Sequence, residues 1–106
     1  MKVIAEGDLK ELLVTGKNRR YKTIAKNKEL FEGLKRAVSF MIAANDIEDL
    51  KKASFLHYEK LKYSYAGLSS VRLSNRYVHR LLFVEEIDRI TLKLIEINDT
   101  HYGNKR

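Results

Sequence analysis

The run HYEKLKYSYAGLSSVRLSNRYVHRLLF, residues 57–83, decides the fold because the spacing of apolar residues changes within it. Upstream of this run, apolar residues recur every three or four positions, as they do on a helix. Within the run they alternate with polar residues, so that Val71 and Leu73 fall on one face of a strand and Arg72 on the other. This alternation predicts strands over residues 61–65, 69–73 and 77–84.

The sheet is expected to continue with one long strand over residues 89–98, after a hairpin turn at 85–88. The apolar residues of this strand keep to one face as far as Leu94 and then change phase, at Ile95 and Ile97. Such a change predicts either a β-bulge or a strand that is buried on both faces.

The N-terminal half predicts helices that cover this sheet. Asn27 is suited to cap a helix that runs to about Ala44, because its side chain can accept a hydrogen bond from a backbone N–H. The apolar residues of this helix share one face: Leu30, Phe31, Leu34, Ala37, Val38, Met41 and Ile42. The other expected elements are a short strand over residues 1–5, a helix over 8–14 with Asp8 as its cap and Thr15-Gly16 as its end, and a helical turn over 47–52.

Helices followed by an antiparallel meander are the layout of an α+β protein. We therefore expect a single domain over residues 1–106, with the N-terminal helices packed on one face of a twisted antiparallel sheet. A chain of this length can bury enough surface to form a real core. The other face of the sheet is then left for a ligand.

The composition limits the partners and the compartment. The net charge is +7, so the surface attracts polyanions such as a nucleic acid or an acidic protein. The chain has no cysteine, which excludes disulfides and thiolate metal sites and fits a reducing cytoplasm. No apolar run is long enough for a signal peptide or a membrane span, so we expect a cytoplasmic protein without a membrane partner.

Part of the positive charge is concentrated between residues 17 and 28, where no acidic residue occurs. The six cations of this basic segment are Lys17, Arg19, Arg20, Lys22, Lys26 and Lys28. Charge blocks are usually solvated surface. The alternative is a patch that follows the phosphates of a nucleic acid, where each neutralised phosphate adds affinity. The sequence leaves both interpretations open.

The polar residues of the run 57–83 are ambiguous when they are taken alone. Glu59 lies among lysines, and such a carboxylate most often forms a surface ion pair of little energetic value. Arg80 fits a solvent-facing position on a strand equally well. The three histidines lack metal-ligand spacing, and no phosphate-binding loop, dinucleotide motif or Ser/His/Asp signature occurs. We therefore expect no metal and no cofactor.

Two stretches of the chain nevertheless resemble a known family. The runs GLSSVRLSNRYVHRLLF (67–83) and ITLKLIEINDTHYGNK (90–105) resemble toxins of the RelE/ParE superfamily, which belong to bacterial toxin–antitoxin pairs. The likeness is greatest to the HigB and YoeB branches, which are ribosome-dependent mRNA endonucleases. It covers about residues 55–103 and extends to the N-terminal helices only in layout. The resemblance implies a RelE-like fold.

The resemblance implies four catalytic residues. Glu59 falls where a YoeB-like toxin has the glutamate that is a candidate base, and Arg80 matches the arginine that touches the scissile phosphate. His101 and Tyr102 match the C-terminal His/Tyr pair of the family. Each of these residue types is present here, so no candidate catalytic group is missing.

The resemblance also implies residues that bind RNA. Lys62 belongs to a Leu-Lys pair that both branches share, Arg72 matches a frequent arginine of the third strand, and Lys60 is a further candidate for binding phosphate. The sequence departs from its relatives in having Ser69 where they often have tryptophan. A two-residue insertion before Arg80 makes the match of Arg72 less direct.

Metal-free cleavage of RNA needs a base for the 2′-hydroxyl, a cation for the charge that builds on the phosphate, and an acid for the leaving 5′-oxygen. Arg80 suits the cation because a guanidinium binds phosphate oxygens in pairs and stays charged. His101 suits the acid because imidazole titrates near neutral pH. Tyr102 would stack on a base or assist the acid. Whether Glu59, a lysine or His101 acts as the base is left open.

As a function, the resemblance implies cleavage of mRNA in the ribosomal A site and inhibition of translation. It also implies a cognate antitoxin, often a DNA-binding protein of the HigA kind. Two alternatives remain, a ParE-like inhibitor of gyrase and a non-catalytic module that binds RNA or antitoxin. Convergence of the predicted catalytic residues on one concave face of the sheet would favour the endonuclease.

Overall fold

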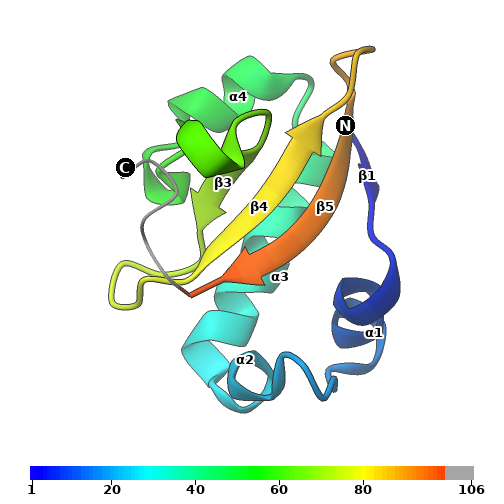
Figure 1. Ribbon diagram of the computed structural model, residues 1–106, viewed down its shortest axis with the longest axis vertical. Coiled ribbons are helices and arrows are strands. Elements are labelled where there is room, and N and C mark those ends of the chain that lie inside the picture. Colours follow the sequence, from blue (N-terminus) through cyan, green and yellow to red (C-terminus); the bar gives the residue numbers. More distant parts are fainter. Residues whose placement is uncertain (100–106) are drawn as a thin grey trace.

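Five strands form one sheet in the order β1-β5-β4-β3-β2 in the computed structural model, which describes residues 1–99 (Figure 1). The strands are β1 (Lys2–Ile4), β2 (Glu59–Lys60), β3 (Ser69–Arg72), β4 (Arg80–Glu85) and β5 (Thr91–Asn98). The pairs β2–β3, β3–β4 and β4–β5 are antiparallel, as the sequence predicts. β1 runs parallel to β5, so the sheet is mixed, and the helices together with β2, β3 and β4 form the long connection that a parallel pair needs.

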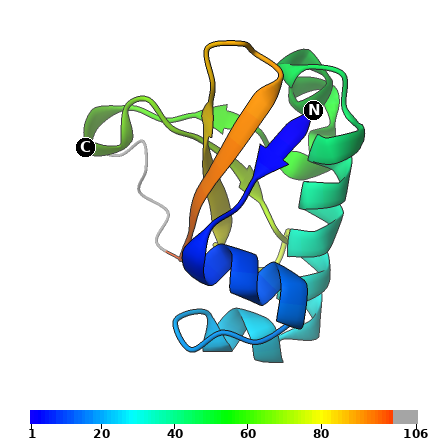
Figure 2. The same cartoon turned by 90° about the vertical axis from the view of Figure 1, so that its right-hand side faces the viewer.

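Helices cover one face of this sheet, which confirms the predicted α+β class. The helical elements are α1 (Gly7–Thr15), α2 (Lys22–Lys26), α3 (Lys28–Ala43), α4 (Ile47–Lys52) and the 3₁₀ turns η1 (Ser54–Leu56) and η2 (Tyr63–Tyr65). Figure 1 shows α3 behind the sheet, and Figure 2 shows it along one side of the strands. The excursion that contains η2 projects on the other side (Figure 2).

The cap and the apolar face that predict the helix α3 are both observed in the structure. The side chain of Asn27 accepts a hydrogen bond of 3.1 Å from the backbone N–H of Leu30, which confirms the predicted cap. Its buried face consists of Leu30, Gly33, Leu34, Ala37 and Met41. Ile42, which the helical spacing also places on the apolar stripe, is 58% exposed, so the buried face is narrower than predicted.

The phase change in β5 is a β-bulge. Leu82 of β4 pairs with Glu96, but the next residue, Phe83, pairs with Leu94, so Ile95 is left without a partner in the ladder. Ile95 is 39% exposed, which rules out burial on both faces. The bulge lets Leu94 and Ile97 both enter the core although they are three residues apart.

Two of the predicted strands differ from the observed elements: one is absent, and the other begins later than predicted. Residues 61–65 form no strand, because pairing with β3 stops after Lys60 and the chain enters the 3₁₀ turn η2. Tyr63 there adopts a left-handed conformation with φ of 58°, which breaks an extended chain. β4 begins at Arg80 rather than at residue 77, because residues 74–79 form an irregular loop.

The start of α1 also differs from the prediction. The helix begins at Gly7, and Asp8 lies in its first turn instead of capping it. The carboxylate of Asp8 accepts a hydrogen bond of 3.0 Å from the side-chain amide of Asn18. The predicted end is correct, since Gly16 has φ of 75° and its N–H donates to the carbonyl of Leu12.

Gly33 sets the distance between α3 and the end of β3. A Cβ atom at this position would lie 1.8 Å from the carbonyl oxygen of Leu73 and 2.8 Å from its carbonyl carbon. Glycine is therefore the residue that lets the helix backbone approach the strand backbone so closely. The close contact fixes the chain immediately after Arg72.

A polar cluster of Tyr58, Ser69 and Glu85 lies where the helix-covered face of the sheet meets its edge. The Tyr58 hydroxyl donates to the Glu85 carboxylate, and Ser69 Oγ donates to the same carboxylate at 2.7 Å. Burial, followed by the bond to Glu85, raises the pKa of Tyr58 to about 12. Burial alone would raise the pKa of Glu85, but the bonds from Tyr58 and Ser69 and the charge of Lys60 together lower it.

This cluster predicts a loss of stability in alkali. Because the pKa of Tyr58 is raised from 10.0 to about 12, the folded protein holds a proton that the unfolded chain releases, so stability falls as the pH rises between these values. Urea unfolding across this range should show the advantage of the wild type over Tyr58→Phe shrinking with pH. A constant difference between the two proteins would contradict the predicted linkage.

Candidate active site on the open face of the sheet

The sheet face opposite α3, which we call the open face, carries three of the five predicted site residues that lie within residues 1–99. Ladder partners point to the same face, and two chains of partners define it: Glu59, Ser70, Leu82 and Glu96 in one, and Arg72, Arg80 and Asn98 in the other. The residues that alternate with these, among them Val71, Leu81 and Phe83, lie in the core. The alternation of β3 and β4 therefore brings three predicted site residues to one surface.

Glu59 and Arg80 form the centre of the candidate site. Nη1 of Arg80 lies 2.9 Å from Oε1 of Glu59 and donates to it, and the same nitrogen donates to Oγ of Ser70 at 3.2 Å. The side chains of Arg80 and Glu59 are 22% and 41% exposed, so the pair is open to solvent from one side. Nε and Nη2 of Arg80 make no hydrogen bond within residues 1–99. A bidentate anion can therefore reach the guanidinium without breaking its support.

Arg72 lies directly opposite Arg80 in the ladder between β3 and β4. Its Nη2 donates to the carbonyl of Tyr77 at 2.9 Å, and its buried Nε has no hydrogen-bond partner among the described residues. Like charges at directly opposed positions repel each other, and an anion between them removes that repulsion. The pair Arg72 and Arg80 is thus a favourable place for a phosphate.

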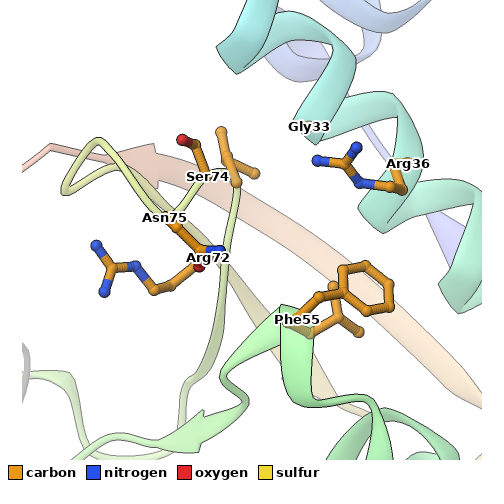
Figure 3. Close-up of a pocket in the computed structure, with 8 residues that line it drawn as sticks. Gly33, Arg36, Phe55, Arg72, Ser74 and Asn75 are labelled. Carbon is orange, nitrogen blue, oxygen red and sulfur yellow. The ribbon is translucent and has the colours of Figure 1, made fainter.

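A hollow of about 280 Å³ lies on the far side of the end of β3, against α3. It is lined by Gly33, Arg36, Phe55, Leu56, Arg72, Leu73, Ser74 and Asn75. Figure 3 shows the guanidinium of Arg36 turned toward Ser74, whereas the guanidinium of Arg72 extends away from Arg36. The backbone of Arg72 therefore borders this hollow, whereas its guanidinium lies on the side of the open face.

The structure separates Lys60 from the candidate site. Lys60 pairs with Ser69, whose ladder partner Phe83 lies in the core under the helices, and its Nζ lies 3.9 Å from Oε1 of Glu85. Alternation along a strand sends neighbouring side chains to opposite faces, so Glu59 and Lys60 cannot share the site. Lys62 is exposed at the start of η2, and no ion pair involves it within the described part of the chain.

His101 and Tyr102 lie outside the described residues 1–99, so their convergence with Arg80 stays a prediction. The structure does place the end of β5 beside the site, since Asn98 is the ladder partner of Arg80.

Sequence reasoning missed several residues of the open face. Ser70 supports Arg80, and Asn98 donates its side-chain amide to the Tyr65 hydroxyl at 3.2 Å and to Oε2 of Glu96 at 3.4 Å. The position of Ser70, two residues before Arg72 on the same strand, was a signal for a shared face. Tyr65 gave no such signal, because it lies in the turn η2, where the alternation of a strand does not apply.

The basic segment lies next to the open face. Nη2 of Arg20 is 3.0 Å from Oε1 of Glu96, and the Tyr21 hydroxyl accepts a hydrogen bond from the N–H of Ile97. The segment borders a wide hollow of about 810 Å³, lined by Glu11, Gly16, Lys17, Asn18, Arg19, Lys22, Ala25 and Lys26. Four of the six predicted cations thus border one concave surface.

Within residues 1–99, no three His, Cys, Asp or Glu side chains are grouped closely enough to hold a metal ion. No helix in the same range combines the length and the apolar character that crossing a bilayer requires.

Comparison with known proteins supports the fold. No protein-family model and no curated protein matches this sequence. A solved structure, the YoeB-YefM complex from Staphylococcus aureus, matches 96% of this chain and 98% of its own with a TM-score of 0.51 and 16% sequence identity. A likeness at this identity establishes the fold and leaves the activity to be argued from the site. Together with the observed α+β architecture, this match shows that the chain has the fold of the YoeB-YefM structure, as the resemblance of its sequence predicts.

Proposed function

We propose that the protein is the toxin of a type II toxin–antitoxin pair and a metal-independent endoribonuclease that cuts mRNA on the ribosome. The observation that carries this proposal is the arrangement of Arg80, which Glu59 and Ser70 hold directly opposite Arg72 on the sheet face away from α3, with the Arg80 side chain 22% exposed. A fixed arginine with a second cation beside it and a carboxylate in contact supplies two of the three groups that metal-free cleavage of RNA needs, the cation and a candidate base. The likeness to a toxin solved with its antitoxin adds to this support.

The reaction we propose is the attack of the 2′-oxygen on the adjacent phosphorus. A base removes the proton of the 2′-hydroxyl, the 2′-oxygen bonds to phosphorus, and the bond to the 5′-oxygen breaks as that oxygen takes up a proton. The products are a 2′,3′-cyclic phosphate and a 5′-hydroxyl, so the step consumes no water and is written without a metal ion. Arg80 stabilises the charge that grows on the non-bridging oxygens, where a preorganised donor is most effective.

The carboxylate of Glu59 is the best-placed base among the described residues because it touches the phosphate-binding guanidinium. A phosphate that binds Nε and Nη2 of Arg80 would leave the contact between Nη1 and Glu59 in place, with the carboxylate close to the attacking sugar. Lys62 and Arg72 would supply further positive charge, and His101 would protonate the leaving oxygen, with Tyr102 beside it. Lys62 and His101 remain the alternatives to Glu59 as the base.

The proposed partners are mRNA in the ribosomal A site and a cognate antitoxin, which in related systems is often a DNA-binding protein. The basic segment supports a polyanionic partner, because Arg20 connects its concave surface to the open face through Glu96. Cations along such a path add affinity through the release of counterions.

Mapping of mRNA ends after incubation with programmed ribosomes tests this function. The proposal expects discrete cuts that leave cyclic-phosphate 3′ ends and 5′-hydroxyl ends, and it expects them in the presence of a chelator. Retention of intact mRNA together with inhibition of gyrase supercoiling would instead assign the ParE-like alternative. Binding of RNA without cuts or gyrase inhibition would leave a non-catalytic module.

A further inference from the structure

We propose that Tyr65 forms a nucleobase-binding subsite beside Arg80, against which a base next to the cut linkage stacks. This inference rests on the proposed ribonuclease function and names the part of the site that orients the substrate. Neither the resemblance nor the predicted catalytic set includes Tyr65.

The subsite is located by one hydrogen bond and one ladder pair. The side-chain amide of Asn98 donates to the Tyr65 hydroxyl at 3.2 Å, and Asn98 is the ladder partner of Arg80. Ladder partners lie on the same face at close range. The Tyr65 hydroxyl is therefore held beside Asn98, on the same sheet face as Arg80. Figure 2 shows that η2, which contains Tyr65, projects on this side of the strands.

The tether is itself supported. Asn98 also donates to Glu96 at 3.4 Å, and Glu96 accepts from Arg20 at 3.0 Å, so a chain of polar side chains links η2 to the basic segment. On the backbone side, the N–H of Leu68 donates to the carbonyl of Tyr65 at 3.1 Å, which closes the turn. A ring fixed in this way loses little conformational entropy when a base stacks on it.

The chemistry of Tyr65 fits a base rather than a second phosphate. Tyr65 is partly exposed, and a phenol ring can stack on any nucleobase. Removal of such a platform typically weakens an interaction with single-stranded RNA about tenfold to a hundredfold. Because every base has such a face, Tyr65 is expected to fix the position of the substrate and to leave the choice of sequence to other groups.

Single-turnover cleavage of ribosome-bound mRNA tests the subsite, with Tyr65→Ala, Tyr65→Phe and a matched control, Tyr63→Ala. Tyr63 lies in the same turn, is 64% exposed and is no part of the proposed site. We expect Tyr65→Ala to cut about tenfold to a hundredfold more slowly, Tyr65→Phe to lose at most a few-fold, and Tyr63→Ala to match the wild type.

A substrate change separates stacking from a general structural role. Messages that carry an abasic ribose on one or the other side of the cut linkage keep the 2′-hydroxyl and lose the base. One of them should slow the wild type by the same factor as Tyr65→Ala, and Tyr65→Ala should be insensitive to it. An unchanged rate in Tyr65→Ala, or equal sensitivity of both proteins to the missing base, would overturn the subsite while leaving the ribonuclease intact. Failure of the wild type to cut the normal message would overturn both proposals.

Discussion

Arg80→Ala is expected to lower the rate of mRNA cleavage by about 100- to 1,000-fold while the protein stays folded, because removal of one preorganised donor at a developing charge has effects of this size. Arg80 is the one proposed catalytic cation that two other side chains, Glu59 and Ser70, hold in place. Its loss leaves Glu59 without this partner, but the carboxylate is 41% exposed and can be hydrated, so the cost in stability should be small.

Arg76→Ala is the matched control for this change. Arg76 also pairs with a glutamate, Glu29, at 3.3 Å, but its side chain is 74% exposed and lies in the loop before β4. Both variants lose one positive charge, so a general effect of charge on RNA binding would slow them equally. Single-turnover rates, with thermal unfolding as a check of the fold, should show a large loss for Arg80→Ala alone. Equal rates for the two variants would remove Arg80 from the catalytic machinery.

Gly33→Ala is expected to lower the free energy of unfolding by about 3 kcal/mol, because the added methyl group would overlap the backbone of Leu73. The overlap is severe, with 1.8 Å between the new Cβ and the Leu73 carbonyl oxygen. In an open position of a helix, the same substitution would stabilise the protein by up to about 1 kcal/mol. The sign of the change therefore distinguishes close backbone packing from simple helix propensity.

Chemical unfolding of Gly33→Ala beside Ser39→Ala provides the measurement and its control. Ser39 lies on the exposed side of α3, so its replacement should leave stability unchanged or slightly raised. A gain in stability for Gly33→Ala would show that α3 can move away from β3 at no cost. Because Leu73 follows Arg72 directly, such a movement would also be expected to shift the phosphate-binding face.

The sequence predicted the parts of the fold that depend on local chemistry. The Asn27 cap, the helical spacing of α3 and the break at Gly16 could be read because each acts within a few residues. The phase change in β5 was also local, and the structure decided between its two explanations through the pairing of Phe83.

Other parts depended on contacts that no local pattern contains. The parallel pairing of β1 with β5 joins segments almost ninety residues apart, with Lys2 opposite Thr91. The turn η2 forms where alternation favoured a strand, because Tyr63 adopts a left-handed backbone conformation that its residue type does not announce.

Some features of the candidate site also follow from local sequence patterns, whereas others depend on the three-dimensional structure. Once β2 and β3 are known, alternation along a strand predicts that Lys60 and Glu59 lie on opposite faces of the sheet. It also predicts that Ser70 and Arg72 lie on the same face. The contact between Glu59 and Arg80 and the tether of Tyr65 required the three-dimensional register. The resemblance to a family predicted that Glu59 and Arg80 belong to one site, but it did not include Tyr65.

Deletions in β5 should differ sharply in their effect according to where they fall. Loss of Ile95 would restore strict alternation and keep every other side chain on its own side, since this is the residue that the ladder with β4 skips. Loss of Ile97 would instead turn the amide of Asn98 toward the hydrocarbon interior, because no skipped residue follows it to restore the register. β5 therefore contains one residue, Ile95, whose removal leaves every other side chain of the strand on its own face.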